Sequence, residues 1–137
     1  MTAVQQRQIS HEAPLVLVVD DGEVNRALVE AFLSDLDCRL QSAEDGQSAL
    51  AAIERETPDL VLLDVQMPGM DGYEVCRRLR QQPGTAKALI VALTGWGQEK
   101  DRRLSRQAGF DHHLVKPVEP EALQALLAGP SPASPVA

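Results

Sequence analysis

The sequence of 137 residues is poor in aromatic side chains, with one Trp, one Tyr and two Phe. A core with so few aromatic rings must consist mainly of Leu, Val, Ala and Ile, and the 44% hydrophobic content supplies them. Such a composition is ordinary for a globular protein and argues against disorder over most of the chain. A chain of this length is expected to form one domain with one core.

Cysteines and long apolar runs are scarce as well. Cys38 and Cys76 have neither CxxC spacing nor the paired spacing of metal ligands, so we expect reduced thiols. The longest apolar stretches, such as residues 15–19, fall far short of the roughly 20 residues that span a bilayer. No signal-peptide segment follows Met1. These features predict a cytoplasmic protein.

An excess of positive charge is also absent. The 13 Lys and Arg residues stand against 20 Asp and Glu residues, which gives a net charge of −7. A chain of this charge repels the phosphates of nucleic acids and the anionic surface of a membrane. We therefore expect no direct binding to nucleic acid or to a membrane.

The two ends of the chain differ in composition from its middle. Residues 1–13 are polar and without pattern, and residues 129–137 are rich in Pro, Ser and Ala. Both are expected to be flexible extensions. The domain itself is expected over residues 14–128.

Within these residues, five short runs rich in Leu and β-branched side chains alternate with longer segments of helical periodicity. The predicted strands are residues 15–19, 38–42, 60–63, 89–93 and 113–115. The predicted helices cover about 23–36, start near 46, start after Asp71, cover about 98–108, and start at Pro120. Three strands are apolar almost throughout, which is typical of parallel strands covered on both faces. The sequence therefore predicts an α/β domain of order (βα)₅.

The helical periodicity also predicts which side chains face the core. The predicted stripe of the first helix is Val24, Ala27, Leu28, Ala31 and Phe32. Asp45 and Asp71 are the predicted N-caps of the second and third helices, the latter with Glu74 in a capping-box-like arrangement. Leu104 and Ala108 are the clear apolar contacts of the fourth helix, so we expect this helix to be the loosest.

Polar side chains close four of the predicted strands. Asp20 and Asp21 follow the first strand, Asp64 the third, Thr94 the fourth and Lys116 the fifth. Right-handed crossovers bring the carboxyl ends of parallel strands to one edge of the sheet, where ligands bind in open α/β folds. Each residue alone has an ordinary structural explanation, such as an N-cap or a solvated lysine. Their convergence predicts a functional site.

Asp64 follows an apolar strand without a nearby partner in sequence, and an unpaired buried carboxylate costs several kcal/mol. Clustered carboxylates favour a hard divalent cation. We expect Asp21, Asp64 and the backbone carbonyl of Gln66 to bind Mg²⁺, with Asp20 acting directly or through water. Mn²⁺ is a plausible substitute.

A metal ion beside an otherwise unactivated aspartate suits attack by the carboxylate on phosphorus. The cation would neutralise one equatorial oxygen of the phosphoryl group, and the Lys116 ammonium a second. The Thr94 hydroxyl or the Gly95 N–H would meet the third. The residues therefore predict that Asp64 accepts a phosphoryl group.

Four motifs carry a family resemblance: DD at 20–21, LLDVQMPGMDG at 62–72, ALTG at 92–95 and LVKP at 114–117. In this order and spacing they resemble the receiver domains of two-component response regulators, over residues 14–128. The resemblance implies a doubly wound, flavodoxin-like sheet of order 2-1-3-4-5. It also implies a cis peptide bond between Lys116 and Pro117, and a loop beside the site shaped by Met67, Pro68 and Gly69.

The resemblance further implies a role for each matching position. The roles are metal binding for Asp20, Asp21 and the Gln66 carbonyl, phosphoacceptor for Asp64, switch hydroxyl for Thr94, and phosphoryl contact for Lys116. The phosphodonor would be a sensor histidine kinase or a histidine phosphotransfer protein. A downstream protein would bind the fourth helix, fifth strand and fifth helix. The domain would not be an enzyme beyond its own phosphorylation and slow dephosphorylation.

Two positions depart from the family pattern. His113 stands where Tyr or Phe is usual, three positions before Lys116. It could take part in the switch with Thr94 and add pH sensitivity, or serve as a plain strand residue. Trp96, between two glycines, could cap the site or anchor a partner.

Three other functions compete with this interpretation. A metal-dependent phosphatase with an aspartate nucleophile would want an acid two positions after Asp64, where Gln66 stands. A flavodoxin-like flavin module would need a hydroxyl-rich phosphate loop after the first strand, where residues 20–23 are acidic instead. A degenerate receiver used only for docking is disfavoured because every key residue is present.

Overall fold

The computed structural model describes residues 13–67, 69, 71–95 and 99–128, with side chains for all of these except 99–101. The expectations for residues 1–12 and 129–137 lie outside the described residues. So do those for Pro68, Trp96 and Gly97.

Five strands and five helices alternate along the described chain, as predicted. The strands are β1 (Leu15–Val19), β2 (Arg39–Ala43), β3 (Leu60–Asp64), β4 (Leu89–Thr94) and β5 (His112–Val115). The helices are α1 (Glu23–Ser34), α2 (Gly46–Arg55), α3 (Gly72–Gln81), α4 (Glu99–Ala108) and α5 (Pro120–Leu127). All neighbouring strands pair in parallel, in the order β2-β1-β3-β4-β5. The predicted doubly wound sheet of order 2-1-3-4-5 is confirmed.

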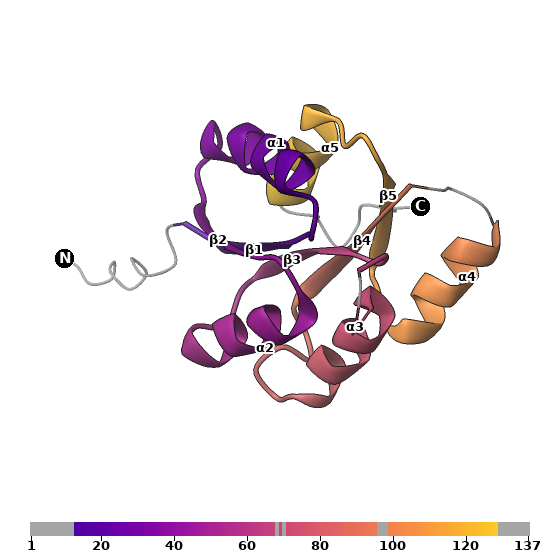
Figure 1. Ribbon diagram of the computed structural model, residues 1–137. Coiled ribbons are helices and arrows are strands. Elements are labelled where there is room, and N and C mark those ends of the chain that lie inside the picture. Colours follow the sequence, from indigo (N-terminus) through magenta and orange to yellow (C-terminus); the bar gives the residue numbers. More distant parts are fainter. Residues whose placement is uncertain (1–12, 68, 70, 96–98, 129–137) are drawn as a thin grey trace.

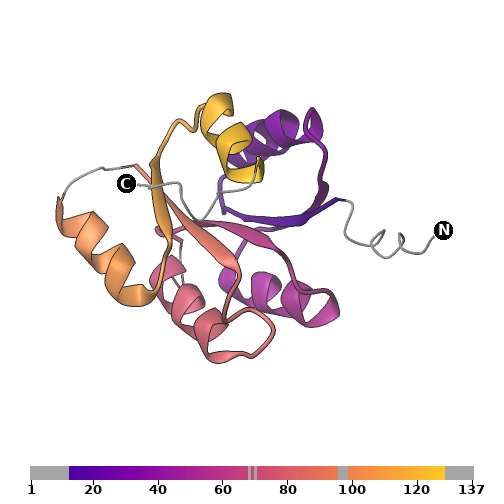
Figure 2. The same ribbon diagram turned by 180° about the vertical axis from the view of Figure 1, so that it is seen from behind.

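The helices lie in two layers, one on each face of the sheet. Figures 1 and 2 show α1 and α5 on one face and α2, α3 and α4 on the other. Successive side chains of a strand point to opposite faces, so each strand contributes to both layers. In β1, Val16 and Val18 pack with the α1 and α5 side, and Leu17 and Val19 pack with the other.

The three central strands account for the apolar runs of the sequence. Every residue of β1 and β3 is buried, and β4 is buried after its first residue. The edge strands β2 and β5 are only partly buried, and they carry the polar side chains that the central strands lack. Burial on both faces therefore explains why the central strands do not alternate.

The predicted N-caps of α2 and α3 are confirmed. The Asp45 carboxylate accepts a hydrogen bond from the Ser48 N–H at 2.7 Å, and that of Asp71 accepts one from the Glu74 N–H at 2.9 Å. The Glu74 carboxylate forms ion pairs with Arg77 and Arg78. Both helices thus begin where their first free N–H groups are satisfied.

The predicted apolar stripe of α1 is wrong in its rotation about the helix axis. Its exposed members are Val24, Ala27, Leu28 and Ala31. Val29 and Leu33 are buried instead, and Phe32 packs partly against the core. The packing of Val29 and Leu33 against the central strands explains the difference. The Asn25 side chain, one turn earlier on the same face, contacts Asp20, which follows β1.

The prediction for Leu104 of α4 is also wrong, because this side chain is 40% exposed. Among the side chains described for α4, from Arg102 to Ala108, those of Ser105 and Ala108 are buried. The end of this helix is held from α3, where the Arg80 guanidinium donates to the Gly109 carbonyl at 2.9 Å and to the Asp111 carboxylate at 2.6 Å. Polar contacts therefore supplement the small apolar face of α4.

Candidate functional site

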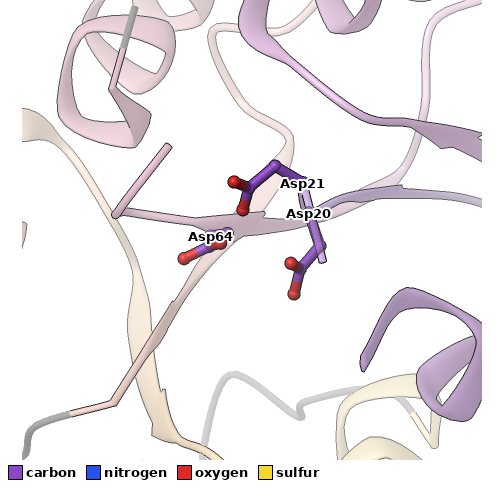
Figure 3. A group of neighbouring side chains, drawn as sticks. All are labelled: Asp20, Asp21 and Asp64. Atoms are coloured by element: carbon purple, nitrogen blue, oxygen red, sulfur yellow. The ribbon is translucent and has the colours of Figure 1, made fainter. Parts of the chain in front are cut away.

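Three carboxylates meet at the carboxyl edge of the sheet. Val19 of β1 pairs with Leu63 of β3, so the residues that follow them lie side by side. Asp20, Asp21 and Asp64 each bring one carboxylate oxygen into a group whose members lie within 4.8 Å of one another. Figure 3 shows these side chains gathered around the ends of the two strands. The predicted acidic cluster therefore forms.

Asp64, the last residue of β3, is buried, with 2% of its surface exposed. Burial raises the pKa of Asp64 to about 6, and the neighbouring Asp20 also raises it. The Gln66 N–H, 3.0 Å from one carboxylate oxygen, and the Lys116 ammonium, 3.3 Å from the other, act in the opposite direction. The environment thus holds a carboxylate whose charge is only partly compensated.

Lys116 reaches the acids from the end of β5. Its ammonium lies 3.3 Å from a carboxylate oxygen of Asp20 and 3.3 Å from one of Asp64. Its backbone N–H donates to the Thr94 carbonyl at 2.8 Å, which fixes its main chain beside β4. The predicted cis bond between Lys116 and Pro117 is confirmed.

Asp20 is held by the first turn of α1. Its two carboxylate oxygens accept hydrogen bonds from the Gly22 N–H at 2.8 Å and from the Asn25 amide at 2.5 Å. The Arg26 guanidinium donates to the Asp20 carbonyl at 2.8 Å. Sequence reasoning missed Asn25 and Arg26. The sequence held one signal for them: Asn25 and Arg26 carry side-chain donors in the predicted first helical turn, shortly after Asp20.

The cluster fits a hard divalent cation by its donor set. Three carboxylates of Asp20, Asp21 and Asp64 contribute oxygens, and the Lys116 ammonium compensates one negative charge, so two remain uncompensated when all three acids are ionised. Asp21 is exposed, which leaves a side open to solvent. Oxygen ligands with room for retained water suit a hard divalent cation.

Thr94 and Gly95 complete the edge of the sheet. Thr94 ends β4 and is 1% exposed, and the exposed Gly95 follows it. His113 pairs with Ala92 in β5, two residues before Thr94, and is half-buried. Thr94, Gly95 and His113 thus lie on or directly after β4 and β5, the paired strands next to Lys116. The roles predicted for them stay predictions.

The loop after β3 is shaped by two glycines. A Cβ added at Gly72 would lie 2.3 Å from the Asp64 carbonyl oxygen and 2.6 Å from the Val65 Cα, so α3 starts in direct contact with the end of β3. Gly69 has a φ of 80°, in the left-handed region that favours glycine. The close approach at Gly72 fixes the segment that carries Gln66, whose carbonyl remains a predicted metal ligand.

A family comparison agrees with the motifs. The model of the response regulator receiver domain matches residues 16–128. The chain belongs to this family. It is therefore a receiver domain of two-component signal transduction, a signalling module.

Curated relatives and solved structures are consistent with this assignment. The response regulator PleD of Caulobacter vibrioides is 42% identical over 104 residues, which cover 76% of this chain and 23% of PleD. The chemotaxis protein CheY4 of Vibrio cholerae superposes with a TM-score of 0.80 at 32% identity, covering 85% of this chain and 97% of CheY4. This chain thus spans less than a quarter of the length of PleD.

A further solved structure bears on the metal. The receiver domain of the sensor histidine kinase PA1611 from Pseudomonas aeruginosa superposes with a TM-score of 0.78 at 35% identity, covering 84% of this chain and 94% of that one. That protein holds a magnesium ion in its active-site cleft.

Among the described residues of the present chain, no helix is both long and apolar enough to cross a membrane.

Proposed function

We propose that this receiver domain accepts a phosphoryl group on Asp64 from a phosphohistidine of a sensor histidine kinase or phosphotransfer protein. One observation carries the proposal. Asp64 is buried among Asp20, Asp21 and Lys116, so a carboxylate nucleophile, an acidic cation site and an ammonium group share one edge of the sheet.

The transfer is a displacement at phosphorus. A carboxylate oxygen of Asp64 forms the new P–O bond, and the P–N bond to the donor histidine breaks with its electron pair going to the imidazole nitrogen. The imidazole then takes a proton from water. Lys116 can leave its position between Asp20 and Asp64 and contact a phosphoryl oxygen, because its ammonium is already within 3.3 Å of both acids.

We propose Mg²⁺ as the cation, with Mn²⁺ as a substitute. Asp21 and Asp64 would bind it directly together with the Gln66 backbone carbonyl, and Asp20 directly or through water. When bound, the ion neutralises charge on the transferring phosphoryl group. The three acids provide the oxygen ligands that this ion prefers.

The signal would leave the site through β4 and β5. In this proposal, the Thr94 hydroxyl or the Gly95 N–H contacts the phosphoryl group, and His113 follows the change. A downstream protein then recognises the altered surface of α4, β5 and α5. The exposed Leu104 and Val115 support such a role, because they place large apolar side chains on α4 and β5.

The domain, over residues 14–128, would catalyse only its own phosphorylation and slow dephosphorylation. Two free thiols, at Cys38 and Cys76, support a reducing cytoplasmic location. We propose no direct contact with nucleic acid or membrane, in line with the net charge of −7.

The test is covalent labelling by a small phosphodonor such as acetyl phosphate in the presence of Mg²⁺. The wild-type protein should gain one phosphoryl group by mass spectrometry, and Asp64→Asn should gain none. Asp37→Asn, which removes an exposed acid away from the cluster, should label as the wild type does. Labelling of Asp64→Asn at the wild-type rate would refute the assignment.

A further inference from the structure

The carboxylate of Asp20 has more hydrogen-bond donors than that of Asp64. The Gly22 N–H lies 2.8 Å from Oδ1, and the Asn25 amide nitrogen lies 2.5 Å from Oδ2. The Lys116 ammonium lies 3.3 Å from the same Oδ2. Asn25 and Lys116 therefore converge on one oxygen of a residue that is 1% exposed.

Lys116 and Asn25 differ in their other contacts. Lys116 is equally close to Asp64, and its proposed contact with a phosphoryl group draws it away from Asp20. Asn25 stands on the first turn of α1, and the structure records Asp20 as its hydrogen-bond partner. When Lys116 turns to the phosphoryl group, the Asn25 amide remains as the side-chain donor that fixes Asp20 Oδ2.

A fixed Asp20 matters because carboxylates that hold a cation must converge without free rotation. The Arg26 guanidinium already holds the backbone of Asp20 through its carbonyl, so the main chain is fixed separately from the carboxylate. Rotation of the carboxylate is limited by the Gly22 N–H at one oxygen and by Asn25 at the other. Groups that orient metal ligands in this way commonly change metal affinity by 10- to 100-fold when removed.

We propose that Asn25 is a positioning residue for divalent-cation binding, which acts by holding the Asp20 carboxylate in the orientation that the acidic cluster needs. This inference rests on the proposed phosphoacceptor function and names one further residue of the same site. Asn25 touches Asp20 and acts through it. Loss of the amide should therefore weaken cation binding while leaving the saturated rate of phosphoryl transfer nearly unchanged.

The experiment compares Asn25→Ala and Asn25→Leu with the wild type. Leu is close to Asn in shape but has no donor, so a role in packing alone would survive this substitution. Gln47→Ala and Gln47→Leu serve as matched controls, because Gln47 is an exposed amide on the first turn of α2. Circular dichroism and thermal unfolding establish that each variant is folded before the binding measurement.

Two readouts are needed. Isothermal titration calorimetry measures the Mg²⁺ dissociation constant without any phosphodonor, and both Asn25 variants should bind about 10-fold more weakly. Acetyl phosphate labelling as a function of Mg²⁺ should show the half-saturating concentration raised by a similar factor, with the plateau rate within about twofold of wild type. Both Gln47 variants should match the wild type in both measurements.

The outcomes separate the two proposals. A wild-type Mg²⁺ affinity in folded Asn25→Leu would overturn the role of Asn25, while labelling of the wild type and its loss in Asp64→Asn would leave the phosphoacceptor assignment intact. A plateau rate that falls by 10-fold or more at unchanged affinity would also overturn it, since Asn25 would then act on the transfer step. An unlabelled wild type would refute the proposed function itself, whatever the calorimetry shows.

Discussion

The Lys116 ammonium lies 3.3 Å from Oδ2 of Asp64, although the two residues are 52 positions apart in sequence, Asp64 at the end of β3 and Lys116 directly after β5. The contact has two consequences. The ammonium lowers the pKa of a carboxyl group that burial otherwise raises. It also stands where negative charge would gather during transfer of a phosphoryl group to Asp64.

Replacing Lys116 by Met should therefore slow the labelling of Asp64. The loss of one preorganised donor to a charged transition state commonly costs about 100-fold in rate, and a fall of this order is expected. The measurement is the initial rate of acetyl phosphate labelling at saturating Mg²⁺. Lys87→Met, which removes an exposed lysine from the segment between α3 and β4, is the control and should retain the wild-type rate. Equal rates in the two variants would exclude Lys116 from the reaction.

Asp64 should also make the metal-free protein less stable at neutral pH than at mildly acidic pH. Its pKa is raised to about 6 in the folded protein, against an ordinary value of 3.8. Below about pH 4 both states hold the proton, and the group has no effect. As the pH rises from 4 to 6, the unfolded chain loses its proton first, so the free energy of unfolding falls.

Asp64→Asn should abolish this fall in the free energy of unfolding between pH 4 and pH 6. In EDTA at pH 7.5 the variant should be more stable than wild type by about 1–3 kcal/mol, and the difference should shrink toward zero near pH 4. Urea unfolding across this pH range measures it. Mg²⁺ should restore stability to the wild type far more than to the variant, because the ion is proposed to bind the folded protein through the Asp64 carboxylate. If the stability advantage of Asp64→Asn over the wild type grew as the pH fell, the raised pKa of Asp64 would be contradicted.

The contact between Gly72 and the end of β3 predicts a steric effect. In Gly72→Ala the new Cβ would meet the Asp64 carbonyl oxygen at 2.3 Å, so the backbone of the loop must shift. We expect a loss of about 3 kcal/mol in the free energy of unfolding, together with weaker Mg²⁺ binding. Gly95→Ala is the stability control, because its Cβ would meet no atom within 4 Å. A change within about 0.5 kcal/mol is expected there.

The sheet and the acidic cluster could be predicted from the sequence because each depends on a short-range pattern. Continuous apolar runs identify buried parallel strands, and the connection rule then brings the ends of those strands to one edge. Asp64 and Lys116 are recognisable for this reason without any knowledge of the distance between them. The predicted ends of all five strands agree with the structure to within one residue.

Helix rotation and side-chain orientation could not be predicted in the same way. The periodicity of α1 allows two apolar faces, one through Val24 and Leu28 and another through Val29 and Leu33. The choice between them depends on the packing of Val29 and Leu33 with the central strands, which is a tertiary interaction. The exposure of Leu104 has a similar origin, since the anchoring of α4 depends on a residue of another helix.

The rotation of α1 can be tested with two substitutions of the same chemistry. Val29 is 1% exposed and Val24 is 82% exposed, although they lie five positions apart in one helix. Val29→Ala should reduce the free energy of unfolding by about 2 kcal/mol, because it removes two buried methyl groups and leaves a cavity. Val24→Ala should change it by no more than about 0.5 kcal/mol, since Ala is the better helix former and little apolar surface is uncovered. Urea denaturation measures both, and a larger loss at Val24 would restore the rotation predicted from the sequence alone.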